Sequence, residues 1–204
     1  MKVNNYPVKT PEAGDKLFGS NSSGDQYQFN MTNVSNNVFT YEIGEYVEDE
    51  GGVIFHRYID NGVQYYLVID TTNLSTNSVW SNVVVSIGST AQSTWDGLSN
   101  SNAIVGQAGF IIGSAKLCLD STNGGQSDWY LPAIQDLNKL WVNMLEVSKG
   151  LEIAGGTQLL FGFYWSSTEY NAGMGWGFNF ISGTSNYGDK GGGDNVRAVR
   201  KFSI

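Results

Sequence analysis

Cysteine, histidine and proline are scarce in this chain, which has one cysteine, one histidine and three prolines among its 204 residues. A single cysteine, Cys118, excludes an intrachain disulfide and any zinc site built from several cysteines. A single histidine, His56, excludes the HExxH motif and other sites that need several histidines. The fold must therefore be stabilised by packing, without disulfides or metal sites of these kinds.

Basic residues are also few, because 11 lysines and arginines are set against 19 aspartates and glutamates, and the formal net charge is −8. Nonspecific nucleic acid binding depends on clustered lysine and arginine, so we expect no nucleic acid partner. No stretch approaches the roughly 18 apolar residues of a membrane-spanning helix, so we expect no membrane insertion. Residues 1–14 lack the apolar segment of a signal peptide, and we expect synthesis in the cytosol without a cleaved export signal.

Common enzyme signatures are missing as well, since the chain has no GxSxG, SxxK, GxxxxGK(S/T) or GxGxxG motif. Cys118 lies in an apolar helical pattern, where a free cysteine usually packs in the core. His56 lies in a predicted strand beside Phe55, where we expect a structural role. Two acids distant in the sequence could still form a glycosidase pair, and that alternative stays open. We expect no catalytic residue, no cofactor and no enzyme activity.

Cation sites have little support in the sequence. The loop DSTNGGQSD offers oxygens from Asp120, Asn123 and Asp128, but the EF-hand spacing needs a ligand where Gly124 stands. We interpret this segment as a plain loop, with a calcium site as the minor alternative. The acidic run from Glu42 to Glu50 is typical of a solvated face.

Glycine and aromatic residues are abundant, with 26 glycines and 13% aromatics, and this composition favours many turns and few long helices. Residues 1–44 are rich in Ser, Asn and Gly and show no sustained period. Such a segment buries too little apolar surface to offset its ordering entropy. We therefore predict an N-terminal attachment or oligomerisation arm at 1–44 and a folded domain at 45–204.

Regular patterns begin at Gly51. The runs GGVIFHRYI and VQYYLVI flank Asn61-Gly62, which predicts a β-hairpin, and residues 80–88 suggest a short strand. Residues 103–119 predict a helix with one apolar face, formed by Ile104, Ala108, Ile111, Ala115 and Leu119. A second helix is predicted from Pro132 to a stop at Lys149-Gly150.

The last part of the chain predicts strands again, because large aromatic residues alternate in FGFYWSS and WGFNF before the closing VRAVRKF. We expect Tyr164, Trp165, Phe178 and Phe180 to fill the core. The nearby glycines, Gly173, Gly175 and Gly177, would let the rings and the backbone approach closely. This layout of hairpin, two helices and further strands predicts an α+β domain with mostly antiparallel sheet.

Five sequence blocks follow one another in a characteristic order: GGVIFHRYIDNGVQYYLVI, DWYLPAIQDLNKLW, YWSSTEY, WGFNF and VRAVRKF. Together they resemble the Lcl C-terminal domain family over residues 51–202. The resemblance implies a C-type-lectin-like fold for this α+β domain with its two predicted helices. Members of that family occur on bacterial surfaces and in phage tail or fibre proteins.

The leader TPEAGDKLFGSNSSGDQYQFNMTNVSNNV is in turn similar to the opening of phage fibre proteins. The two resemblances together imply a structural protein of the virion surface, such as a tail fibre, head fibre, spike or decoration subunit, made in the cytoplasm of the bacterial host. The arm would contact other virion proteins, and the domain would bind a glycan or protein of the host surface. Fibres are commonly trimeric, so we expect a homotrimer. The alternative is a bacterial cell-surface or secreted adhesin of the same family.

Candidate receptor-binding residues are those on the later loops that lie outside the alternating core positions, since loops on a rigid scaffold commonly carry recognition. They are Tyr170, Asn171, Met174, Tyr187, Asp189, Lys190, Asp194 and Asn195. Arg197 and Arg200 we expect to be structural, paired with backbone or carboxylate groups.

Overall fold

The computed structural model describes residues 16–20, 26–30 and 39–204. The chain divides into two compact units, Met1–Thr40 and Tyr41–Ile204. In the first unit, strands β1 (Lys16–Ser20) and β2 (Gln26–Asn30) pair in antiparallel fashion. The rest of the arm expected at residues 1–44 lies largely outside the described residues.

The second unit, which we call the body, includes Tyr41, so the expected boundary between residues 44 and 45 lies inside it. The ring of Tyr41 packs 5.4 Å from that of Tyr66 and 6.0 Å from that of Phe202, measured between centroids. Its carbonyl accepts a 2.6 Å hydrogen bond from Arg57 Nη1. Tyr41 is therefore anchored to the strands of the body.

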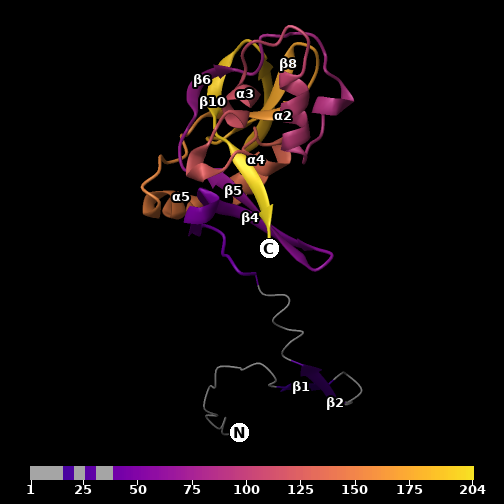
Figure 1. Cartoon of the computed structure of the whole chain (residues 1–204), viewed down its shortest axis with the longest axis vertical. Helices are drawn as coiled ribbons and strands as arrows, with labels where there is room; N and C mark the ends of the chain where they lie inside the picture. Colours follow the sequence, from indigo (N-terminus) through magenta and orange to yellow (C-terminus); the bar gives the residue numbers. More distant parts are fainter. Residues whose placement is uncertain (1–15, 21–25, 31–38) are drawn as a thin grey trace. The chain divides into compact units, whose positions relative to one another are not determined.

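Two sheets make up the β structure of the body (Figure 1). The first is antiparallel in the order β11-β5-β4-β3, from β3 (Tyr46–Val47), β4 (Gly52–Asp60), β5 (Val63–Asp70) and β11 (Val199–Ser203). The second has the order β6-β10-β7-β8-β9, from β6 (Ser75–Val79), β7 (Phe163–Glu169), β8 (Met174–Asn179), β9 (Thr184–Asp189) and β10 (Gly193–Val196). The pair β10–β7 is parallel and the other pairs are antiparallel. The body is thus α+β with mostly antiparallel sheet, as expected.

The hairpin predicted around Asn61-Gly62 is confirmed. Asp60 pairs with Val63, and the two turn residues have φ angles of 49° and 81°. Positive φ at both positions is the signature of a type I′ turn, which Asn-Gly favours because glycine carries no Cβ. The hairpin β4–β5 forms one wall of the pocket that is described below.

The helices of the described residues differ from the two that the sequence predicts. They are α2 (Gly97–Val105), α3 (Ser114–Leu119), α4 (Ile134–Val142) and α5 (Met144–Ile153), with short 3-10 turns at Glu48–Glu50, Ser89–Ala91 and Asn123–Gly125. The single helix expected at 103–119 is wrong. Gly109 has a φ of 83°, which a helix does not accommodate, and Ile111 is exposed.

The second predicted helix is interrupted at Asn143, whose side chain donates a 3.0 Å hydrogen bond to the carbonyl of Phe55. The predicted stop at Lys149-Gly150 is also wrong, because α5 continues to Ile153 with Gly150 packed against the backbone of Gly44. The strand expected at 80–88 is displaced, since β6 ends at Val79 and residues 80–88 are irregular.

The main core lies between the two sheets and helices α4 and α5. Tyr164, Trp165, Phe178 and Phe180 are all buried, as predicted. Gly175 lies directly against Trp80, where an added Cβ would sit 2.6 Å from the indole, whereas an added Cβ at Gly173 would meet only Asn171 Oδ1, at 3.9 Å.

The structural role predicted for the two late arginines is confirmed. Arg197 is buried and donates 2.8 Å hydrogen bonds to the carbonyls of Asp70 and Thr157. Arg200 pairs with Asp128 and Glu50. Both arginines therefore join the last strands to distant segments of the body.

Candidate recognition surfaces

Two of the sequence-predicted residues, Tyr170 and Tyr187, stack face to face on the surface. Their ring centroids are 4.2 Å apart with an interplanar angle of 5°, and 41% of Tyr170 and 45% of Tyr187 is exposed. Tyr170 directly follows β7, and Tyr187 lies in β9. The structure therefore brings together two residues that are far apart in the loop segment.

Trp176 in β8 completes this surface, although sequence reasoning assigned it to the alternating core strand. It pairs with Tyr187 across the β8–β9 ladder, and its ring stands nearly perpendicular to both tyrosines, at 81° to Tyr170 and 85° to Tyr187. The pattern that could have revealed it is the cross-strand register with Tyr187. We call Tyr170, Trp176 and Tyr187 the aromatic cluster.

Asn171, Met174 and Asp189 lie at the turns next to the aromatic cluster. Asn171 Oδ1 accepts a 2.9 Å hydrogen bond from Gly173 N, and Asp189 Oδ1 accepts one of 2.7 Å from Gly191 N. Met174 pairs with Asp189 across the ladder. These residues thus shape the two turns, while the exposed Asn171 and Asp189 still face solvent.

The expectation that Lys190 points outward is wrong. Lys190 is fully buried, with its Nζ 2.7 Å from Glu169 Oε1 and 4.7 Å from the centroid of the Trp80 ring. Asn195 is turned inward as well, since its Nδ2 donates a 2.8 Å hydrogen bond to the carbonyl of Phe163. Asp194 is partly buried, and burial raises the pKa of its carboxyl. Lys190 and Asn195 therefore serve the fold, because a buried charge or amide needs a partner inside the protein.

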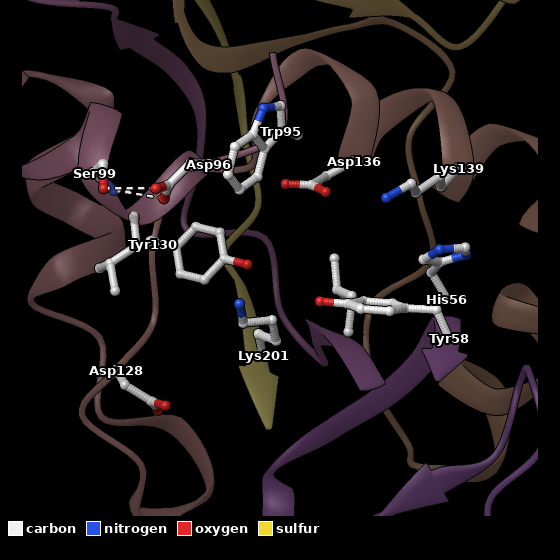
Figure 2. Close-up of a pocket in the computed structure, with 13 residues that line it drawn as sticks. His56, Tyr58, Trp95, Asp96, Ser99, Asp128, Tyr130, Asp136, Lys139 and Lys201 are labelled. Atoms are coloured by element: carbon white, nitrogen blue, oxygen red, sulfur yellow. Dashed lines mark hydrogen bonds between the residues drawn. The ribbon is translucent and has the colours of Figure 1, made fainter. Parts of the chain in front are cut away.

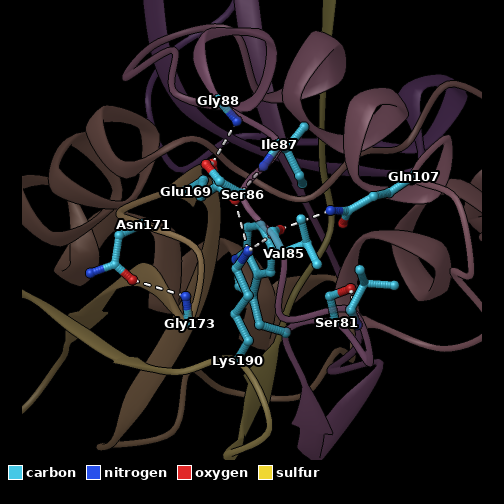
Figure 3. Close-up of polar contacts among 12 residues, drawn as sticks. Ser81, Val85, Ser86, Ile87, Gly88, Gln107, Glu169, Asn171, Gly173 and Lys190 are labelled. Atoms are coloured by element: carbon cyan, nitrogen blue, oxygen red, sulfur yellow. Dashed lines mark hydrogen bonds and ion pairs between the residues drawn. The ribbon is translucent and has the colours of Figure 1, made fainter.

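The ion pair of Glu169 and Lys190 fixes the irregular segment 81–88 (Figure 3). Glu169 accepts hydrogen bonds of 2.9 Å from Ile87 N and 2.8 Å from Gly88 N. Burial alone would raise the pKa of Glu169, but the hydrogen bonds from Lys190, Ile87 and Gly88 lower the pKa below its ordinary value. Because Glu169 directly precedes Tyr170, this contact also fixes the backbone that carries the aromatic cluster.

A pocket of about 590 Å³ lies elsewhere in the body, between the β4–β5 hairpin, β11 and the starts of α2 and α4 (Figure 2). None of the receptor-binding candidates from the sequence lines it. Its lining is mostly aromatic and charged, and consists of His56, Tyr58, Leu67, Trp95, Asp96, Gly97, Leu98, Ser99, Asp128, Tyr130, Asp136, Lys139 and Lys201.

Burial shifts the pKa values of two acid–base groups in this pocket, Asp136 and His56. It raises the pKa of Asp136 to about 6, against the hydrogen bond that Asp136 Oδ2 accepts from Ala133 N at the start of α4. Burial, aided by the nearby charge of Lys139, lowers the pKa of His56 to about 4. The imidazole is therefore neutral at neutral pH, and His56 faces a pocket instead of serving the core alone.

In the loop from Asp120 to Asp128, which was considered as a calcium site, the candidate ligand side chains are bonded to other residues of the protein. Asn123 Nδ2 donates a 2.8 Å hydrogen bond to Asp70 Oδ1, Asp128 pairs with Arg200, and Asp120 pairs with Lys116. Among the residues that the structure describes, no three or more His, Cys, Asp or Glu side chains are grouped so as to hold a metal ion. In the same described ranges, no helix is long and apolar enough to cross a membrane.

The model of the Lcl C-terminal domain matches residues 69–200, which is more than half of the chain. The chain belongs to the Lcl C-terminal domain family. A search of curated proteins finds no match. The matched Lcl C-terminal domain contains the whole aromatic cluster and the Glu169–Lys190 pair, whereas His56 and Tyr58 of the pocket precede the match.

Proposed function

We propose that this member of the Lcl C-terminal domain family is a structural protein of a phage virion, with the C-type-lectin-like fold, and that it binds a glycan or protein of the host surface through the aromatic cluster. It would be a fibre, spike or decoration subunit on the virion surface. The fibre-like leader and the family's occurrence in phage fibre proteins support this assignment. Attachment to other virion proteins through residues 1–44 and assembly as a homotrimer are parts of the same proposal.

The observation that carries the proposal is the exposed stack of Tyr170 on Tyr187, with Trp176 in edge contact with both rings. Tyrosine and tryptophan offer a large, flat contact area with few rotatable bonds, and their hydroxyl and N–H groups add hydrogen bonds. Because the three rings already restrain one another, binding a ligand would cost little side-chain conformational entropy. A face of this kind suits the apolar side of a sugar ring or an apolar side chain of a receptor.

The arrangement of the body also fits display at the particle surface. The chain enters the body next to β4 and β5, near the C-terminus, and β8 lies toward the opposite end of the body (Figure 1). A body held at its entry end would leave the β8 end free to meet a host cell. The one cysteine offers little reactivity, because burial raises the pKa of the Cys118 thiol well above its ordinary value, and this favours recognition over thiol catalysis.

The test is a phage that carries Tyr170→Ala together with Tyr187→Ala in the full chain. We expect the double variant to keep its melting temperature within a few degrees, since exposed substitutions usually change stability by less than about 0.5 kcal/mol. Adsorption to host cells should fall at least about tenfold, the scale of losing one good aromatic contact.

Phe161→Ala is the matched control, because Phe161 is 75% exposed and lies outside the aromatic cluster. It should leave adsorption unchanged. Normal adsorption by particles that have incorporated the Tyr170/Tyr187 double variant would overturn the assignment of the aromatic cluster as the receptor site.

A further inference from the structure

We propose that the pocket bounded by Tyr58, Trp95, Tyr130 and Asp136 is a second binding site, which takes one neutral pyranose sugar. No residue of the aromatic cluster lines this pocket. The inference therefore does not depend on the proposed function, and the two can fail separately.

The size and walls of the pocket suit a single sugar ring. Its volume of about 590 Å³ lies within the range of small-molecule sites. Tyr58 and Tyr130 present their rings to the cavity, and Trp95 stands at its edge with 73% of its surface exposed (Figure 2). Such exposure of an indole at a cavity edge provides a flat apolar surface, on which the C–H face of a pyranose can stack.

Polar groups without a protein partner converge on the same space. Tyr130 is only 7% exposed, yet its hydroxyl has no hydrogen bond to any described residue and points into the pocket (Figure 2). The hydroxyl of Tyr58 likewise has no hydrogen bond within the described part of the chain. Asp136 is 1% exposed and uses Oδ2 for the backbone of Ala133, while Oδ1 accepts none from the described residues. All three residues line the open cavity, so these polar atoms are accessible to a polar ligand that enters it.

The charges of the pocket favour an uncharged ligand. Lys139 and Lys201 form no ion pair with described residues, and they are balanced by the carboxylates of Asp96 and Asp136. The remaining acid, Asp128, is already paired with Arg200. A ligand with a strong charge of either sign would meet a like charge on one side of the cavity. Sugar hydroxyls both donate and accept, so they can use the carboxylates, the ammonium groups and the neutral imidazole of His56 together.

The experiment titrates the full chain with three neutral sugars, glucose, galactose and mannose, and with two charged ones, glucuronate and glucosamine. Ligand-observed NMR and calorimetry would measure the affinities. We expect at least one neutral sugar to bind with a Kd of the order of millimolar, and more tightly than either charged sugar. Trp95→Ala should weaken that binding about tenfold, and Tyr130→Phe, which removes only the hydroxyl, roughly fivefold.

Two comparisons separate this site from the aromatic cluster and from loss of folding. The Tyr170→Ala/Tyr187→Ala double variant should bind the sugar as the parent does, and both pocket variants should keep the parent's far-ultraviolet circular dichroism and cooperative thermal unfolding. No binding of any neutral sugar at up to about 50 mM, well above a millimolar Kd, would overturn the inference. So would a preference for a charged sugar, or binding that Trp95→Ala and Tyr130→Phe leave unchanged.

Discussion

Tyr164 and Trp165 are neighbours in β7 and point to opposite faces of the sheet, yet both are buried. The alternation in FGFYWSS placed Trp165 correctly in the interior, but it also suggested that Phe161 shares its environment, and Phe161 is exposed. Phe161 precedes β7, which begins at Phe163, and it therefore does not share the buried environment of that strand. The strand itself lies inside the five-stranded sheet with both faces covered, so its sequence shows no polar face. Burial of single aromatic residues was therefore predictable, but not the face that each one occupies.

Replacing Trp165 by alanine tests its place in the core. The indole is buried, and its Nε1 donates a 2.9 Å hydrogen bond to the carbonyl of Ser78. We expect Trp165→Ala to lower the free energy of unfolding by about 3–5 kcal/mol, the range for large aromatic truncations. Urea unfolding measures this loss, with Phe161→Ala as a control that should change stability by less than about 0.5 kcal/mol. A loss below about 1 kcal/mol on the same scale would mean that the ring contributes little to packing.

Asp136 gives a pH prediction at the same scale. Burial raises its pKa from 3.8 to about 6, so the folded protein binds this proton more tightly than the unfolded chain does, and protonation favours folding. The stability that protonated Asp136 contributes to the fold is fully present below about pH 4, and it is lost as the pH rises through 6. Asp136→Asn removes the titration, so its stability relative to the parent should increase by up to about 3 kcal/mol between about pH 4 and pH 7.

Urea unfolding of the parent and Asp136→Asn at several pH values measures this difference. Asp60→Asn, at the exposed end of β4, controls for the removal of one negative charge. A stability difference that stays constant with pH, or that decreases as the pH rises, would contradict the assignment.

At the scale of elements, the sequence predicted structure correctly where a turn accepts only a few residue types. Asn61-Gly62 predicted the hairpin because only a few residues tolerate its φ angles. The helix expected at 103–119 failed because its 3.6-residue period was interrupted by glycines that connect two separate helices. The aromatic cluster was found in part, since Tyr170 and Tyr187 lie in the predicted loops. The pocket was missed, because its lining comes from strands, loops and helices that are distant in the sequence.

The irregular segment 81–88 should depend on the ion pair of Glu169 and Lys190. Lys190→Met leaves Glu169 buried without its partner, and breaking a buried pair in this way costs about 3–5 kcal/mol. We also expect faster amide hydrogen exchange at Ile87 and Gly88, whose N–H groups donate to Glu169. Glu169→Gln combined with Lys190→Met removes both charges and should cost less than Lys190→Met alone. Unchanged stability and exchange in Lys190→Met would show that the segment is fixed by other contacts.

For the whole molecule, the division at Thr40 and Tyr41 separates a body with its own core from the preceding residues. Composition alone indicated two regions and placed the boundary at residue 44. It could not show that Tyr41 belongs to the body, because the contacts of Tyr41 with Tyr66 and Phe202 form only in the folded protein.

We expect a chain of residues 41–204 to remain folded and soluble, with the melting temperature of the full chain, but to be absent from purified particles. Unfolding of this truncated chain, or its normal incorporation, would contradict the role proposed for the arm.

The central claim is that this protein is displayed on a phage particle, and electron microscopy tests it most directly. Particles and cells from the source culture would be labelled with gold-coupled antibodies raised against residues 41–204, and preimmune serum would serve as the control. The account predicts gold at defined positions on the virion surface. Gold on the bacterial envelope, with unlabelled particles in the same culture, would contradict the account and support a bacterial adhesin of the same family.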